Sequence, residues 1–494
     1  MSIASVKKSS RFWSLLQLTS MSAALLSAHA HASDLSYLQG LLAATPEGGW
    51  VKANSNSFAS SWAVSGQGGM PVGSHAHPGT VIAAWSSFAW DSNSHSLLLW
   101  GGGHATYKGN EMYVWDGASG AWGRGSLPSR IEQYQNTGSW LVVDDAAPQS
   151  SHTYDGNIFL PINNMFLTFG GASYNIGNGG FEVKDGNGGI KRAGPWMWDP
   201  LKADPSKVGG TTGSGYLPIS QGGQMWINRQ GQWTGTEPWS TFRGYISNVT
   251  AYREEAGQDV VYLSPQSGST GYPGLFRYAI GDVRNGGLDS WEQVGVTKNA
   301  IAIDGAATID TAHNLFVRTA PLAGQQADLS VWDLARNNAT DPSANADKAV
   351  QLINEDGSPF SLNYDYGLNF DTGSGKIYLW SGDKGSVWET EASYDANGSL
   401  QSVWKVRRLV STTAAQPNGN FLNGVYGKWQ YAEDLGAFVA LDEFNFSTNT
   451  GGDVWLYKPF ASQVPEPAQL ELVLAGLLGL YIRSRSKNAS SSLI

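Results

Sequence analysis

Histidine, tyrosine, arginine and lysine side chains recur beside a series of short glycine motifs in this chain. Tyrosine rings pack against sugar rings, and arginine binds a carboxylate through two parallel hydrogen bonds. The same residue types support proton transfer, with His104 or His152 as base and Tyr154 as acid. Arg243 would supply a cation that stabilises developing negative charge. These four residues are the candidate catalytic residues if the protein is an enzyme.

Eight further residues at comparable positions are candidates for binding a ligand. Each also has a structural interpretation, because buried polar groups satisfy turn backbones and tyrosine is a common strand residue. The binding candidates are Tyr107, Asn110, Glu111, Tyr245, Tyr364, Tyr366, Tyr426 and Lys428. His104, His152 and Glu111 could share a zinc ion, but no close-spaced pair of ligands occurs, so we assign no metal and identify no cofactor.

A repeat positions these side chains. A glycine followed by alternating apolar residues recurs at Gly156, Gly244, Gly305, Gly367 and Gly427, and an earlier copy without the glycine begins at Trp85. Each copy continues with a turn and a second apolar run, and several continue with a third and a fourth. Four short strands per unit predict the blades of an all-β propeller, and no helical periodicity occurs outside the two ends of the chain.

Six copies of the first strand predict six blades, or seven if Lys202 to Trp239 form an additional one. The last copy lacks a fourth strand, and Gly49 to Ala53 near the N-terminus are predicted to supply it. Such a strand closes the ring without leaving a free edge.

The order of the strands in a blade predicts which loops lie on the same face of the ring. The loop entering the innermost strand and the loop joining the second and third strands share one face. Residues before each repeat glycine therefore meet those after Gly103, and the candidates gather at one mouth of the ring.

The composition fits an all-β protein of low charge. The chain has 61 Gly and 21 Trp, and only 15% of its residues are charged. A net charge of −10 argues against non-specific nucleic-acid binding. There is no cysteine, so stability comes from packing without disulfides.

The N-terminus has the order of a secretory signal peptide. Lys7, Lys8 and Arg11 precede an apolar run, and Ala30-His31-Ala32 offers a cleavage site. We therefore expect a signal peptide over residues 1–32 and a propeller domain over residues 33–460.

The C-terminus, residues 461–494, has three parts. Pro465-Glu466-Pro467 precede an apolar stretch from Leu470 to Ile482, and Arg483, Arg485 and Lys487 follow as a basic stop. This order resembles the PEP-CTERM sorting signal of Gram-negative bacteria. The resemblance implies a short transmembrane helix in the inner membrane, cleavage there by an exosortase, and release to the outer surface or extracellular matrix.

The body resembles kelch repeats. Gly101-Gly102-Gly103-His104 is followed by Tyr113-Val114-Trp115-Asp116 and Trp122, and Phe169-Gly170-Gly171 with Trp198-Asp199 is a second copy. Galactose oxidase also has kelch-type blades, but its copper-bound tyrosine is cross-linked to a cysteine, and this chain has none.

Two functions fit these patterns. The first is an exported propeller that binds carbohydrate, with an exopolysaccharide as its partner. The alternative is a lyase acting on a uronate-containing polysaccharide, similar in plan to propeller-fold lyases. In a lyase Arg243 or Lys428 would be the cation, and Tyr154 or Tyr245 the acid. A glycosidase ranks lower, because Glu111 is the one obvious carboxylate at the mouth.

Overall fold

The computed structural model describes residues 35–461 except 63–76, 105–106, 134–139, 145, 174–181, 185–189, 193, 212–218, 236–247, 266–273, 299–303, 320–326, 364 and 420. The predicted signal peptide and the sorting residues Pro465, Glu466, Pro467, Arg483 and Arg485 lie outside the described residues. So do Arg243, Tyr245 and Tyr364. Within the described part, no helix has the length and hydropathy needed to cross a membrane.

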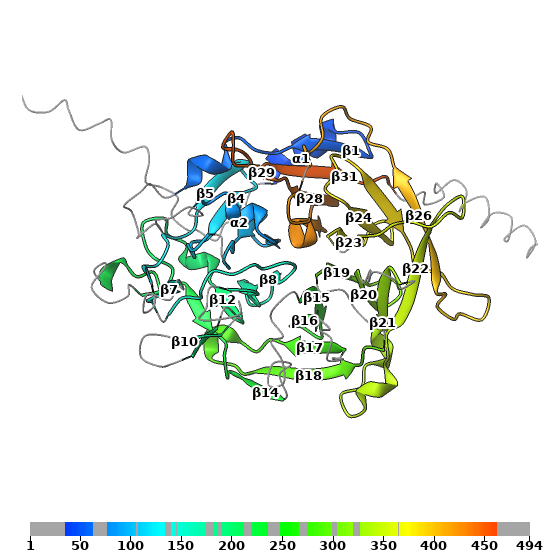
Figure 1. Cartoon of the computed structure of the whole chain (residues 1–494), viewed down its shortest axis with the longest axis horizontal. Helices are drawn as coiled ribbons and strands as arrows, with labels where there is room; N and C mark the ends of the chain where they lie inside the picture. Colours follow the sequence, from blue (N-terminus) through cyan, green and yellow to red (C-terminus); the bar gives the residue numbers. More distant parts are fainter. Residues whose placement is uncertain are drawn as a thin grey trace, which may run out of the picture.

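The described strands form consecutive four-stranded antiparallel units arranged around a central axis, which makes the protein an all-β propeller (Figure 1). Neighbouring innermost strands contact one another around the whole ring. From the innermost strand outward, the first three units are β2 (Phe88–Asp91), β3 (Ser96–Leu99), β4 (Tyr113–Asp116) and β5 (Ala121–Arg124); β8 (Asn157–Leu160), β9 (Met165–Thr168), β12 (Trp196–Trp198) and β13 (Trp226–Asn228); and β15 (Val249–Glu255), β16 (Gln258–Ser264), β17 (Leu275–Ala279) and β18 (Asp289–Gly295).

The remaining units complete the ring in the same order. They are β19 (Ala307–Asp310), β20 (Leu315–Thr319), β21 (Leu329–Asp333) and β22 (Lys348–Asn354); β23 (Gly367–Asp371), β24 (Lys376–Trp380), β25 (Val387–Thr390) and β26 (Val403–Leu409); and β27 (Trp429–Ala432), β28 (Ala437–Leu441), β31 (Val454–Lys458) and β1 (Gly49–Lys52). Three short hairpins lie outside these units: β6 (Ile131–Gln133) with β7 (Trp140–Val142), β10 (Glu182–Lys184) with β11 (Ile190–Arg192), and β29 (Phe444–Asn445) with β30 (Thr450–Gly451).

The expectation of six or seven separate blades is corrected by the sheet pairing. In the described residues the large sheets are four of four or five strands and one of eight strands. The first half of β22 pairs with β21, but Gln351–Asn354 continue past that unit and pair in parallel with Val403–Val406 of β26. Both strands are seven residues long, so each has backbone groups left over that the neighbour satisfies.

The segment from Lys202 to Trp239 does not form a blade of its own in its described residues. It provides β13 to one sheet, and β14 (Trp233–Gly235) pairs in parallel with β18 of the next. Each strand thus covers the outer edge of an existing sheet.

The predicted closure of the ring is confirmed. Gly49–Lys52 of β1 pair antiparallel with Trp455–Lys458 of β31, so the N-terminal strand completes the last unit.

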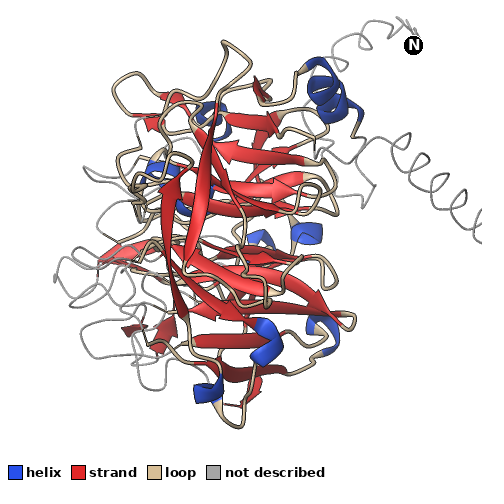
Figure 2. Ribbon diagram, turned by 90° about the vertical axis from the view of Figure 1, so that its right-hand side faces the viewer, coloured by secondary structure: helices blue, strands red, loops and turns tan. Residues whose placement is uncertain are grey.

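The absence of helices was a wrong expectation. The described residues include α1 (Ser36–Ala44), α2 (Thr80–Ala83) and several short 3-10 turns (Figure 2). Leu38 and Leu42 are the buried residues of α1, and the Lys458 amine donates to the Leu42 and Thr45 carbonyls at 3.0 and 3.1 Å. Two buried leucines four residues apart are too short a pattern to stand out as helical periodicity.

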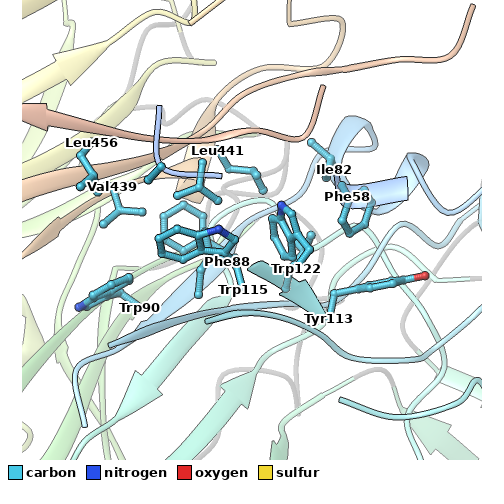
Figure 3. Packing of buried hydrophobic residues seen from close by; sticks show 14 of the residues in the cluster. Phe58, Ile82, Phe88, Trp90, Tyr113, Trp115, Trp122, Val439, Leu441 and Leu456 are labelled. Atoms are coloured by element: carbon cyan, nitrogen blue, oxygen red, sulfur yellow. The ribbon is translucent and has the colours of Figure 1, made fainter. Parts of the chain in front are cut away.

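The largest core cluster joins the first and last units (Figure 3). Phe88, Trp115 and Trp122 of the first unit pack with Val439 and Leu456 of the last. Buried apolar surface therefore holds the first and last units together, in addition to the strand pairing that completes the last unit.

Candidate functional site

An aromatic residue stands three positions before the innermost strand in three neighbouring repeats. Trp85 precedes β2, Tyr154 precedes β8 and Tyr426 precedes β27. Because these strands are neighbours around the ring, the three loops meet at one mouth.

Two histidines join them. The rings of His104 and His152 lie 5.4 Å apart and edge-on, and Trp85 stacks on His152 at 4.6 Å. Tyr154 lies 6.1 Å from His152 and 5.9 Å from Tyr426. We call Trp85, His104, His152, Tyr154 and Tyr426 the mouth cluster. His104 comes from the loop between β3 and β4, so the two kinds of loop share a face.

Four of the five residues have a left-handed backbone. The φ angles are 45° for Trp85, 50° for His104, 49° for Tyr154 and 48° for Tyr426. Large side chains rarely adopt this conformation, which costs about 1–2 kcal/mol for each residue. Such strain persists where the surrounding structure enforces it, and it concentrates at functional sites.

Backbone hydrogen bonds between the loops enforce the strain. The Trp85 carbonyl accepts from the amides of Thr153 and Tyr154 at 3.0 and 2.7 Å, and the Tyr154 carbonyl accepts from the Gly427 amide at 3.3 Å. The Asp365 carbonyl accepts from the Val425 amide at 2.7 Å. The loops therefore hold one another across repeat boundaries.

The mouth cluster has a buried side and an accessible side. Tyr426, His152 and Tyr154 are 1%, 4% and 8% exposed, whereas Trp85 and His104 are half-buried. A ligand would therefore meet Trp85 and His104 first, with the other rings behind them.

His152 is electrostatically unusual. Burial, followed by the neighbouring His104, lowers the pKa of His152 to about 3, so the imidazole is neutral at ordinary pH. Among the described residues its Nε2 atom has no hydrogen-bond partner. A buried polar atom without a partner is costly, so its presence calls for a structural or functional reason.

Tyr107, Asn110 and Glu111 form a support beneath the His104 loop. Tyr107 and Tyr113 donate to the same oxygen of Glu111 at 2.5 and 2.6 Å. Asn110 accepts from the Ser129 amide at 2.8 Å and donates to the Pro148 carbonyl at 3.0 Å. All of the candidates in this group are buried, which favours their structural interpretation.

Burial raises the pKa of Glu111, against the lowering effect of the two tyrosine hydroxyls. No group of three or more His, Cys, Asp or Glu side chains suited to a metal ion gathers among the described residues.

Lys428 and Tyr366 do not join the mouth cluster. The Lys428 amine is buried, donates to the Ile82 carbonyl at 3.1 Å and lies 4.7 Å from the centre of the Phe421 ring. Burial lowers its pKa to about 8. Tyr366 packs against Phe360 and Trp388 at 6.2 and 5.7 Å.

Trp85 is the member that the sequence reasoning missed. The first repeat begins at Trp85 but lacks the glycine that marks the others, so Trp85 was not among the candidates chosen by their position before that glycine. The aromatic residue three positions before the strand was the available signal, shared by Trp85, Tyr154 and Tyr426.

No known protein family and no curated protein sequence matches the chain. Among solved structures, a mutant of the α-L-arabinofuranosidase Arb93A from Fusarium graminearum, in complex with an iminosugar inhibitor, covers 75% of this chain and 92% of its own, with 11% identity and a TM-score of 0.36. The GH43_1 enzyme from Xanthomonas citri with xylotriose covers 67% of this chain and 94% of its own, with 9% identity and a TM-score of 0.30. The Dos1 propeller covers 76% and 93%, with 10% identity and a TM-score of 0.30. These similarities are too distant to assign a function.

Proposed function

We propose that this protein is an exported propeller that binds carbohydrate, an exopolysaccharide in particular, at the mouth cluster. The observation that carries the proposal is the gathering of five ring side chains from loops of three neighbouring repeats, four of them held in a strained backbone. Half-buried Trp85 and His104 offer an apolar ring face and a hydrogen-bonding group to a sugar.

Binding to a panel of acidic and neutral polysaccharides tests this function. Retardation of the purified protein in gels containing each polymer would reveal binding, and absorbance from new carbon–carbon double bonds would reveal cleavage. We expect retardation by at least one polymer. No retardation by any member of the panel would contradict the proposal.

A polysaccharide lyase is the second candidate, and the contact between His152 and Tyr154 favours it. A lyase base removes the proton next to the uronate carboxylate, and an acid protonates the leaving oxygen. With a pKa of about 3, His152 is a weak base, so His104 fits that role better and Tyr154 would be the acid. Arg243, outside the described residues, stays the proposed cation, because Lys428 is committed to the Ile82 carbonyl.

Replacing His104, the proposed base, by alanine separates the two candidates. A lyase would lose turnover while keeping most of its polymer binding, whereas a binding protein would lose only affinity. Replacing Arg243 by alanine should lower the affinity for an acidic polymer about tenfold to a hundredfold and leave folding nearly unchanged.

We also propose that the chain is sorted by its two ends and that its repeats are kelch-like. Signal peptidase and an exosortase would be its processing partners, with the inner membrane as a transient location. The mature chain would begin near Ser33 and end near Pro467. Intact-mass measurement of protein released by the native host tests this, and retention of Leu470 to Ile482 would refute the sorting proposal.

A further inference from the structure

A cavity lies inside the ring, and none of the mouth-cluster residues lines it. Its volume is about 480 Å³, within the range of small-molecule sites, and residues of all six innermost strands line it. It extends from Asp155 to hairpin residues such as Ser92, Thr311 and Thr372. Asp155 follows Tyr154 directly, so one backbone segment separates the cavity from the mouth cluster.

The inner end of the cavity is polar. One oxygen of Asp155 accepts from the amides of Thr250 and Ala307, each at 3.0 Å. Burial raises the pKa of Asp155 well above its usual range, which favours an uncharged acid at this point.

Asn157 is one of the lining residues and is held by hydrogen bonds behind the cavity wall. Its amide nitrogen donates to the carbonyls of Ser87 and Trp100 at 2.9 and 3.0 Å. Its Oδ1 atom has no partner among the described residues, although the residue is only 1% exposed. That atom is closed to solvent, whereas the half-buried residues Asn369 and Gln430 also line the cavity and have side-chain amides that suit a ligand hydroxyl.

The charged residues of the lining are already paired or lie at the rim. Arg253 binds Glu255 and Asn314, each at 2.5 Å. Asp434 accepts from the Trp90 indole at 2.9 Å and lies 2.5 Å from the His95 ring nitrogen. Glu254 and Glu433 are exposed at the open end. Among the described residues of the lining, the interior therefore offers no unpaired charge to an ionic ligand.

The walls combine apolar and hydroxyl groups. Ile158 and Ala251 alternate with Asn157 and Thr250 along β8 and β15, and the Tyr252 ring also lines the space. We propose that this channel binds a small neutral polyol or monosaccharide, whose hydroxyls meet polar lining residues such as Asn369 and Gln430 and whose C–H groups meet the apolar wall. This inference does not rest on the proposed function, because the two sites are separate.

Titration calorimetry with xylose, glucose, galactose, sorbitol and myo-inositol at concentrations up to tens of millimolar tests the channel site, with glucuronate as the charged comparison. We expect a neutral compound to bind and glucuronate to bind more weakly. Ala251→Leu and Ala307→Leu each fill part of the cavity and should weaken binding about tenfold or more. Ala344→Leu makes the same change on the exposed surface and should have no effect.

The results separate the channel from the mouth cluster. Trp85→Ala should leave small-sugar binding unchanged, and the channel variants should leave polysaccharide retardation unchanged. Retained near-ultraviolet circular dichroism identifies folded variants. One folded variant of the two that fill the cavity, Ala251→Leu or Ala307→Leu, is sufficient for the test. No heat from any neutral compound would overturn the inference, and so would undiminished binding in a folded filling variant.

Discussion

Two aromatic clusters in this protein both contain tryptophan and tyrosine, but one stands on paired strands and the other on loops. The seam cluster comprises Trp50, Trp380, Trp429, Phe438 and Tyr457, which stand on paired strands of the last two units. Trp429 stacks on Phe438 at 4.4 Å with an interplanar angle of 5°. The mouth cluster stands on loops with a strained backbone and includes a buried imidazole atom without a partner. The Tyr457 hydroxyl of the seam cluster is also buried without a partner among the described residues, so the left-handed backbone is what separates the mouth cluster from this core.

The largest effect is expected at the seam cluster. Trp50 is 1% exposed, lies 5.0 Å from Tyr457, and donates its indole N–H to the Gly385 carbonyl at 3.3 Å. Trp50→Ala should lower the free energy of unfolding by about 3–5 kcal/mol, because it leaves a cavity where the ring closes.

Urea denaturation of the variant and of Val410→Ala, whose side chain is 76% exposed, measures this loss. Deleting Gly49 to Ala53 should go further, since it exposes the edge of β31 and promotes aggregation. A variant with Trp50 removed and an unchanged denaturation midpoint would show that the strand does not hold the ring.

The mouth cluster should contribute to the pH dependence of stability through His152. His152 has a pKa of about 3 in the folded chain, against an ordinary value of 6.5. Between these values the unfolded chain binds a proton that the folded chain does not, so the free energy of unfolding falls as pH falls. The limiting slope is about 1.4 kcal/mol per pH unit for this one group.

Urea denaturation near neutral pH and at about pH 4.5 measures this slope. His152→Asn should reduce the slope, whereas Trp50→Ala should lower stability equally at both pH values. Equal slopes in His152→Asn and the unchanged protein would mean that His152 is not held neutral by its surroundings.

The smallest effect concerns the strained backbone itself. Lys384 has a φ angle of 49° and an exposed side chain on a turn, so Lys384→Gly should raise stability by about 1 kcal/mol. Tyr426 has a φ angle of 48°, but Tyr426→Gly should lower stability, because the ring is 1% exposed and contacts Tyr154. Thermal unfolding of both variants provides the comparison. A gain of stability in both would mean that packing does not compensate the strain at the mouth.

The sequence was sufficient for those parts of the fold that depend on local patterns. Alternating apolar residues located the strands, and the missing fourth strand of the last repeat indicated that Trp50 and its neighbours close the ring. Pairing between units was not predictable in this way. The parallel contacts of β22 with β26 and of β14 with β18 depend on how far an outer strand extends beyond its own sheet.

The candidate site was predictable only through the order of strands. That order indicated that His104 and His152 share a face, and the structure places their rings in contact. It did not indicate that Lys428 turns into the protein toward Ile82, because the direction of a side chain after a glycine depends on backbone angles. Trp85 was not predicted as a member of the mouth cluster, because its repeat has no glycine by which to locate the entry loop.

The central claim is tested most directly by the affinity of the Trp85→Ala variant for the polysaccharide that retards the unchanged protein in gels. Trp233→Ala is the matched control, because it removes another half-buried indole from β14 at the outer edge of a sheet. We predict that Trp85→Ala weakens binding in affinity gels about tenfold to a hundredfold while Trp233→Ala does not. Equal affinities for the two variants, with both folded, would contradict the assignment of the mouth cluster as the carbohydrate site.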